Sequence, residues 1–273
     1  MNALNRFWTA NSPVRALLVA AVFTVITPFV HAKETVMTKP TVVLVHGAFA
    51  ESSSWNRVTT KLLAKGYPVV AVANPLRSVK GDASYLASLL DAIPGPVILV
   101  GHSYGGTVIT VAATGKGNVK ALIYVSGLAP DTGETASALV GKFPGSTLGP
   151  TLAPPVILAD GSKDLYILQA KFHAQFAADL PAGEAQLMAT TQRPIPEAAF
   201  NEPAAGEPAW KTIPSFFLYG SLDKNVPPAV HAFMAKRAGA KETVEIKGSS
   251  HVVMMSHPDA LVKLIDDADA QIR

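Results

Sequence analysis

The stretch PVILVGHSYGGTVITVAATG, residues 96–115, joins a run of apolar residues to a helix-like pattern through a glycine-rich turn. The first five residues favour a β-strand, and the apolar residues after the turn repeat at the spacing of a helix face. Gly101 and Gly105 have no Cβ atoms to collide where the strand reverses into the helix. The sequence therefore predicts a strand, a sharp turn and a helix, with Ser103 held on the turn in a strained backbone conformation.

Ser103 on this turn is a candidate nucleophile. It lies at a predicted helix N-terminus, where free backbone N–H groups and the helix dipole stabilise developing negative charge. A Gly-x-Ser-x-Gly pattern also arises by chance in sequences rich in small residues, but the strand before it and the helix after it favour the nucleophile. Such a serine needs a base to take its proton and a carboxylate to orient that base.

The rest of the chain alternates between predicted strands and helices. Five further stretches are predicted strands: residues 41–45, 68–72, 121–125 and 215–219, which are mostly apolar, and residues 242–246. Helical patterns follow at residues 55–63, at residues 82–93 with Asp82 as the predicted N-cap, after Pro227–Pro228 and after Pro258. This alternation predicts an α/β fold with a doubly wound, mostly parallel sheet.

An insertion interrupts this alternation at about residues 130–213. Of the 21 prolines in the chain, eleven lie between Pro130 and Pro214. Four residues inside the segment have helical spacing and predict one apolar stripe: Leu165, Leu168, Phe172 and Phe176. Shorter helices are predicted at residues 184–190 and 197–200. Because the insertion follows the carboxyl end of a strand, we expect it to form a helical cap over the Ser103 turn.

Residues 1–32 have the pattern of a secretory signal peptide. Arg6 and Arg15 are followed by an apolar run that ends at Val30-His31-Ala32, and the run is too short to span a membrane. We expect cleavage after Ala32 and export to the periplasm or the medium. The remaining residues, 33–273, are long enough for a single α/β domain with an insertion.

Composition narrows the classes of function. The formal net charge is +3, of which Arg6 and Arg15 contribute +2, so the mature chain is near +1 and has no basic cluster. The sequence therefore predicts neither a nucleic-acid partner nor, after removal of the signal, a membrane partner. The chain contains no cysteine, which excludes disulfides, thiolate metal sites and a cysteine nucleophile.

Asp223 and His251 are the candidate acid and base. Asp223 lies four residues beyond a predicted strand in a loop rich in glycine and proline, and His251 follows the last predicted strand. The order serine, acid, histidine is the one expected for this architecture. His257 is the rival base, but it precedes Pro258 and is better placed at the start of the final helix. Two other histidines, His46 and His102, flank glycines and are expected to brace their turns.

The backbone N–H groups of Ala48 and Tyr104 are the predicted donors to the oxyanion of a tetrahedral intermediate. Tyr104 follows the nucleophile, and Ala48 follows His46-Gly47 at the end of the first strand. The N–H of Phe49 is the alternative to that of Ala48. The side chains of Phe49 and Leu128 are expected to line an apolar substrate pocket, in which affinity rises with acyl length until the cap is met.

With these residues placed, the sequence resembles the α/β-hydrolase superfamily, and among its members the compact bacterial esterase-like proteins related to plant methylesterases and hydroxynitrile lyases. The resemblance rests on four stretches: Val43–Phe49, Gly101–Gly106, the Asp223 loop and Ser250–Pro258. It implies hydrolysis of carboxylic esters through an acyl-enzyme, a helical cap and no cofactor. The expected partner is a small, neutral, largely apolar ester. No oligomeric state is predicted.

The sequence also bears on four other functions. A hydroxynitrile lyase of this group carries threonine and lysine where this chain has Gly47 and Val252, which disfavours lyase activity. A serine at 103 disfavours dehalogenase or epoxide-hydrolase chemistry, which uses a carboxylate nucleophile. A relative that cleaves thioesters or lactones would use the same residues, and a non-catalytic protein that binds a small ligand could retain the pocket.

Overall fold

The computed structural model describes residues 39–272, so the predicted signal peptide lies outside the described residues. A six-stranded parallel sheet forms the centre of the fold, with the strand order β2-β1-β3-β4-β8-β9. Its strands are β1 (Thr41–Val45), β2 (Val69–Val72), β3 (Val97–His102), β4 (Val119–Val125), β8 (Ser215–Gly220) and β9 (Glu242–Ile246). The predicted α/β fold with a doubly wound sheet is confirmed.

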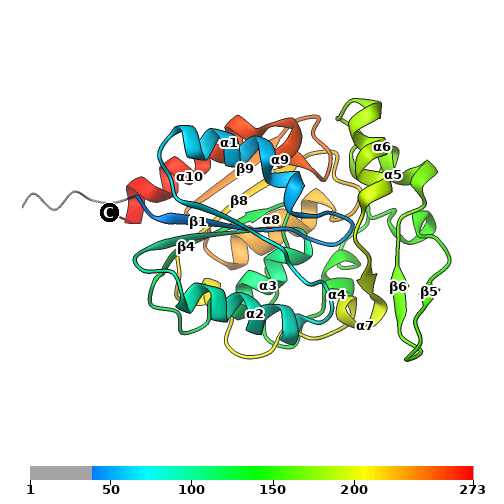
Figure 1. The fold of residues 1–273 in the computed structure, drawn as a ribbon, viewed down its shortest axis with the longest axis horizontal. Coiled ribbons are helices and arrows are strands. Elements are labelled where there is room, and N and C mark those ends of the chain that lie inside the picture. The colour runs from blue at the N-terminus through cyan, green and yellow to red at the C-terminus, as the bar shows by residue number, and fades with distance from the viewer. Residues whose placement is uncertain (1–38, 273) are drawn as a thin grey trace, which may run out of the picture. The chain divides into compact units, whose positions relative to one another are not determined.

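Helices cover both faces of this sheet. They are α1 (Asn56–Ala64), α2 (Val79–Asp91), α3 (Tyr104–Ala112), α8 (Pro228–Arg237), α9 (Val253–Ser256) and α10 (Pro258–Ile272), and a 3₁₀ turn, η1 (Ser52–Trp55), precedes α1. Figure 1 shows α1 and α10 on one face and α2 and α3 on the other. No helix within residues 39–272 is both long and apolar enough to cross a bilayer.

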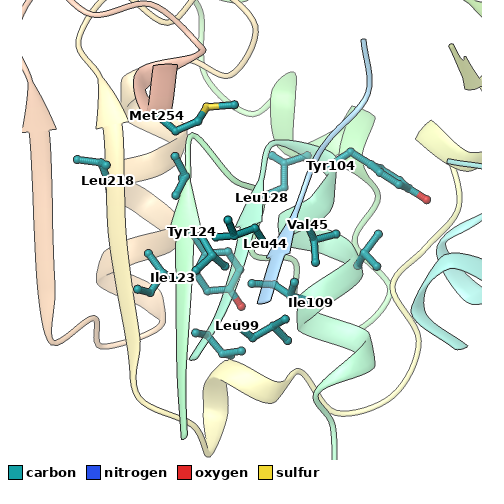
Figure 2. Close-up of a cluster of buried hydrophobic side chains, with 14 of the residues drawn as sticks. Leu44, Val45, Leu99, Tyr104, Ile109, Ile123, Tyr124, Leu128, Leu218 and Met254 are labelled. Carbon is teal, nitrogen blue, oxygen red and sulfur yellow. The ribbon is translucent and has the colours of Figure 1, made fainter. Parts of the chain in front are cut away.

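The core is centred on the middle strands. Every residue of β3 is buried, whereas the edge strand β9 alternates between half-buried and exposed residues. This difference explains why the middle strands have nearly continuous apolar sequences. Figure 2 shows their side chains meeting those of α3, with Leu99, Ile109 and Tyr124 among them. Since the chain has no cysteine, this apolar core carries the stability that a disulfide would otherwise supply.

The strand register brings the chemistry-bearing loops to one edge. Val45 of β1 pairs with Gly101 of β3, and Gly101 pairs with Tyr124 of β4. These three strands therefore end at nearly the same level, and the loop after β1 lies beside the turn after β3. In open parallel sheets, ligands bind at this carboxyl edge.

The N-cap of α2 differs from the prediction. The helix begins at Val79, and the Ser78 hydroxyl accepts a 2.9 Å hydrogen bond from the Gly81 N–H. Asp82 lies inside the first turn, is buried, and accepts a 3.0 Å hydrogen bond from the Tyr104 hydroxyl. Both residue types cap helices well, so the tertiary contact of Asp82 with Tyr104 decides between them.

The segment between β4 and β8 carries additional elements. They are α4 (Ala136–Val140), η2 (Gly149–Thr151), β5 (Val156–Ile157), β6 (Lys163–Leu165), α5 (Gln169–Phe176), α6 (Ala182–Thr191), β7 (Ile195–Pro196), α7 (Glu197–Phe200) and η3 (Ala209–Lys211). Strands β5, β6 and β7 form a small antiparallel sheet that the sequence analysis did not predict. Figure 1 shows α5, α6, β5 and β6 gathered at one end of the main sheet. This segment is called the cap below.

The predicted apolar stripe of the cap is wrong in its first half. Leu165 ends strand β6, and Leu168 precedes α5 with 38% of its surface exposed. Only Phe172 and Phe176 lie on the helix, and both are buried. The antiparallel pairing of Leu165 with Ile195 of β7 takes it out of the helix, although its spacing is helical.

Candidate active site

Ser103 lies on the turn between β3 and α3 with φ 53° and ψ −123°, a strained conformation for a residue with a side chain. A Cβ atom at Gly101 would lie 2.6 Å from the Gly105 carbonyl oxygen, and one at Gly105 would lie 2.5 Å from the Val45 carbonyl oxygen. The two glycines therefore permit the close turn, as the sequence predicts. Hydrogen bonds from Gly106 N–H (2.9 Å) and Leu128 N–H (3.0 Å) to the Ser103 carbonyl hold this conformation.

His251 and Asp223 form a buried pair on the loops after β9 and β8. Nδ1 of His251 lies 2.7 Å from Oδ2 of Asp223, and both side chains are inaccessible to solvent. Because the Asp223 carboxylate accepts at this distance, Nδ1 of His251 is the donor, and Nε2 is the ring nitrogen that Asp223 does not engage. Nε2 has no hydrogen-bond partner within residues 39–272. His251 lines the same cavity as Ser103, whereas His257 contacts Ser256 at the start of α10.

A second imidazole contacts the same carboxylate, and sequence reasoning missed it. Nε2 of His231, on α8, lies 3.2 Å from Oδ2 of Asp223. The ring is fully buried and stacks on Tyr219 with centroids 4.9 Å apart. The sequence predicts a helix after Pro227–Pro228 but gives His231, which lies in that helix, no role. His231 lies eight residues after Asp223, but this spacing alone does not indicate a contact. The contact follows only when α8 is known to pack on β8.

The surroundings of Asp223 favour its ionised form. Burial by itself raises the pKa of this carboxyl, but the charges and hydrogen bonds of His251 and His231 outweigh it, so the pKa lies well below its usual range. The other oxygen, Oδ1, accepts from the backbone N–H groups of Asn225 (2.9 Å) and Val226 (3.0 Å). Asp223 is therefore a fixed, buried anion that can orient an imidazole and stabilise its cation.

The loop after β1 lies directly against the serine turn. A Cβ atom on Gly47 would lie 2.6 Å from the Ser103 Cβ and 3.1 Å from the Tyr104 nitrogen. In the described part of the chain, the N–H groups of Ala48 and Tyr104 have no acceptor. The Phe49 N–H donates to the Arg193 carbonyl at 2.9 Å, so the alternative donor named in the sequence analysis is already occupied.

Two buried neutral histidines brace these turns. Nδ1 of His46 lies 3.0 Å from the Gly47 carbonyl oxygen, and its Nε2 accepts from the Asn74 N–H at 3.2 Å. Burial lowers the pKa of His46 to about 4. His102 donates from Nε2 to the His251 carbonyl at 3.2 Å, and burial lowers its pKa well below its usual value. Uncharged rings at both positions give fixed hydrogen bonds at neutral pH.

A carboxylate of the cap holds the loop that carries His251. Asp179, between α5 and α6, accepts hydrogen bonds from the hydroxyls of Ser249 (2.8 Å) and Ser250. Burial raises the pKa of Asp179, but these serine hydroxyls and that of Ser256 outweigh it, so its pKa is lowered and it stays ionised. The cap thus fixes the backbone immediately before His251.

Ser103 and His251 face a small, mostly apolar cavity of about 20 Å³. Its lining comprises Ala48, Phe49, Ser103, Tyr104, Leu128, Val140, Leu148, Phe176, Phe200, Asn225, Val226 and His251. The predicted pocket residues, Phe49 and Leu128, are both among them. A larger groove of about 380 Å³, between η1, α1 and α6, also has Phe49 in its lining, so this side chain is common to both spaces. Within residues 39–272, no cluster of histidine or acidic side chains has the geometry of a metal site.

Comparisons with known proteins agree with this architecture. Residues 42–264 match the model of the Alpha/beta hydrolase family. Alpha-hydroxynitrile lyase of Arabidopsis thaliana is 26% identical over 249 residues, which cover 84% of this chain and 95% of that protein. Methylesterase 3 of the same plant is 25% identical over 249 residues, which cover 83% of this chain and 95% of that protein.

A solved structure shows the same fold. The crystal structure of polyneuridine aldehyde esterase aligns with a TM-score of 0.72 at 19% identity, covering 84% of this chain and 98% of that chain. The family match extends over most of the described residues and agrees with the sheet order and with the relatives. The chain therefore belongs to the α/β-hydrolase family, and it is related to the plant methylesterases.

Proposed function

We propose that this protein is a serine hydrolase that cleaves carboxylic esters through an acyl-enzyme intermediate. The observation that carries the proposal is the buried His251–Asp223 pair, whose free Nε2 belongs to a ring that lines the same cavity as Ser103. A nucleophile on a strained turn, a base with one free nitrogen and a buried acid together fit acyl transfer. The esterase and lyase names of the relatives support this reaction class.

In the proposed reaction, the Ser103 Oγ attacks the ester carbonyl carbon and its proton passes to Nε2 of His251. The N–H groups of Ala48 and Tyr104 donate to the oxyanion that forms. When the C–O bond to the alcohol breaks, His251 gives its proton to the leaving oxygen. Water then attacks the acyl-enzyme with His251 again as the base, releasing the acid and restoring Ser103.

The cavity favours a small, neutral acyl group. It offers apolar side chains from the core and the cap, and its lining has no charged lysine, arginine, aspartate or glutamate. A charged substrate would lose its hydration without gaining a partner. At about 20 Å³ the cavity has room for about one water molecule. A longer acyl chain therefore requires Phe49 or another lining side chain to move.

Lyase activity is the second candidate, because a lyase is among the relatives. Gly47 and Val252 oppose it, since neither can supply the hydroxyl or ammonium group that the lyases carry at these positions. Thioester or lactone cleavage would proceed by the same steps. A pure binding role leaves the Asp223–His251 pair without a purpose, since binding alone needs no general base.

A kinetic series tests the proposal. Turnover of p-nitrophenyl acetate and butyrate should fall on the order of 10⁵- to 10⁶-fold in Ser103→Ala and in His251→Ala, and by somewhat less in Asp223→Ala. The double Ser103/His251 variant should lose little more than either single one. His257→Ala is the matched control and should be nearly as active as the parent protein. If His257→Ala lost turnover while His251→Ala kept it, the assignment of the base would be wrong.

A further inference from the structure

Asn225 places an unpartnered polar group beside the candidate catalytic residues. The residue is 3% exposed and lines the cavity together with Ser103 and His251. Its Nδ2 group is buried and has no hydrogen-bond partner within residues 39–272. Apart from Ser103, His251 and the tyrosine, every other side chain in the lining is apolar. A buried donor without an acceptor costs free energy, so its retention needs an explanation.

The hydrogen bonds around Asn225 fix which end of its amide is free. The Lys224 carbonyl can only accept, and it lies 3.0 Å from Nε2 of Gln175, which sets the orientation of that amide. The same Nε2 donates to Oδ1 of Asn225 at 3.0 Å. The Thr147 hydroxyl donates to Oε1 of Gln175 at 2.8 Å and completes the arrangement. A flipped Asn225 would set two NH₂ groups against each other, so Nδ2 is the free end.

The position of Asn225 is also fixed relative to the acid. Its backbone N–H donates to Oδ1 of Asp223 at 2.9 Å. The loop that orients the acid therefore also positions the free amide. Such a rigid donor is suited to recognising an acceptor atom on a bound molecule, because little freedom is lost on binding.

We propose that Nδ2 of Asn225 donates a hydrogen bond to a second oxygen of the substrate, distinct from the ester group. The preferred substrates are then neutral esters that carry a keto or ether oxygen on the part that enters the cavity. This inference rests on the proposed ester hydrolysis and narrows its substrate class. A site built to bond such an oxygen rejects an analogue in which a carbon replaces it, because the donor is then left unpaired.

Two pairs of esters that differ in one atom or group test the proposal. Ethyl 3-oxobutanoate against ethyl 3-methylbutanoate places the oxygen on the acyl side, and 2-methoxyethyl acetate against butyl acetate places it on the alcohol side. In at least one of the two pairs, the parent protein should give a higher kcat/KM for the oxygenated ester than for its carbon analogue. The near-isosteric variant Asn225→Leu should lower the ratio of these two kcat/KM values roughly tenfold, the factor expected for one hydrogen bond.

Two further variants keep the test informative. Gln175→Leu does not alter a residue of the cavity lining but frees the Asn225 amide to rotate, so it should lower the same ratio by a smaller factor even if Asn225→Leu fails to fold. Asn201→Leu alters an exposed asparagine of the cap and should leave the ratio unchanged. Equal ratios in the parent, Asn225→Leu and Gln175→Leu would overturn the inference alone. Failure of the parent protein to hydrolyse any of the four esters would instead overturn the proposed function.

Discussion

Nε2 of His231 lies 3.2 Å from Oδ2 of Asp223, the same carboxylate oxygen that His251 contacts at 2.7 Å. One buried oxygen therefore accepts from two imidazoles. The bond from His231 withdraws electron density that would otherwise strengthen the bond to His251. His231 thus holds the carboxylate of Asp223, and we expect it to moderate the effect of Asp223 on His251.

His231→Phe should change the pH dependence of turnover. The phenyl ring keeps the stack on Tyr219 but cannot donate to Asp223, so the carboxylate should stabilise the imidazolium of His251 more strongly. The acidic limb of the kcat/KM profile should therefore move to higher pH. His231→Gln, which retains an N–H donor, should bring the limb back towards the parent position. If the acidic limb of the kcat/KM profile lay at the same pH in the parent protein and in both variants, the proposed effect of His231 on Asp223 would be refuted.

Asp179→Asn should loosen the loop that carries His251. The amide has only one acceptor oxygen and no charge, so the charge-assisted hydrogen bonds from Ser249 and Ser250 are weakened and one of them can persist only with its direction reversed. We expect the free energy of unfolding in urea to fall by about 1 to 2 kcal/mol and kcat to fall severalfold. Glu184→Gln is the control, since the ion pair of Glu184 with Arg57 is exposed and should contribute about 0 to 1 kcal/mol. Equal losses in both variants would argue against a special role for Asp179.

Phe49→Ala should widen the acyl specificity. The Phe49 ring contacts Phe176 edge-on at 6.2 Å and belongs to the linings of both the closed cavity and the larger groove. Without the ring, kcat/KM should rise roughly 3- to 4-fold per methylene from acetate to hexanoate, the factor that about 0.8 kcal/mol implies. In the parent protein, the rise in kcat/KM should stop at a shorter acyl chain. Leu63→Ala, at an exposed position on α1, is the control and should keep the parent dependence of kcat/KM on acyl length. The same dependence in Phe49→Ala as in the parent protein would contradict a role for Phe49 as the wall between the cavity and the groove.

His46 should make the folded protein less stable as the pH falls from 6.5 to about 4. Burial lowers its pKa from 6.5 to about 4, so between these values the unfolded chain binds a proton that the folded protein does not. The two pKa values differ by about 2.5, which corresponds to a loss of on the order of 3 kcal/mol in the free energy of unfolding as the pH falls from 6.5 to 4. When the free energy of urea unfolding is plotted against pH over this range, the slope should be shallower in His46→Gln than in the parent protein. Leu62→Ala should lower the free energy of unfolding without changing this slope. A slope in His46→Gln equal to that of the parent protein would contradict the assignment.

The features that the sequence predicted well depend on neighbours along the chain. The serine turn follows from residues 101–105, and the strand over residues 41–45 follows from four consecutive apolar residues after Thr41. The contact between Asp223 and His251 could be anticipated because each lies just beyond a predicted strand. Parallel strands bring such loops to one edge of a sheet whatever the distance between them along the chain.

The features that were missed or wrong depend on contacts between distant segments. The bond of His231 to Asp223 requires the packing of α8, and the free amide of Asn225 requires Gln175, 50 residues earlier in the chain. The sequence predicts Asp82 as an N-cap, but the N-cap is Ser78, and Asp82 is buried against Tyr104 inside the first turn. Periodicity alone cannot supply such pairings.

The central claim is that Ser103 is the nucleophile, and covalent labelling tests it most directly. The full-length protein is treated with a neutral fluorophosphonate, its intact mass is measured, and the modified peptide is sequenced. We expect one adduct per chain on Ser103, none in Ser103→Ala, and labelling at least about 10²-fold slower in His251→Ala, because the base activates the hydroxyl. A folded protein that remains unlabelled, or an adduct on another serine with Ser103 unmodified, would contradict the account.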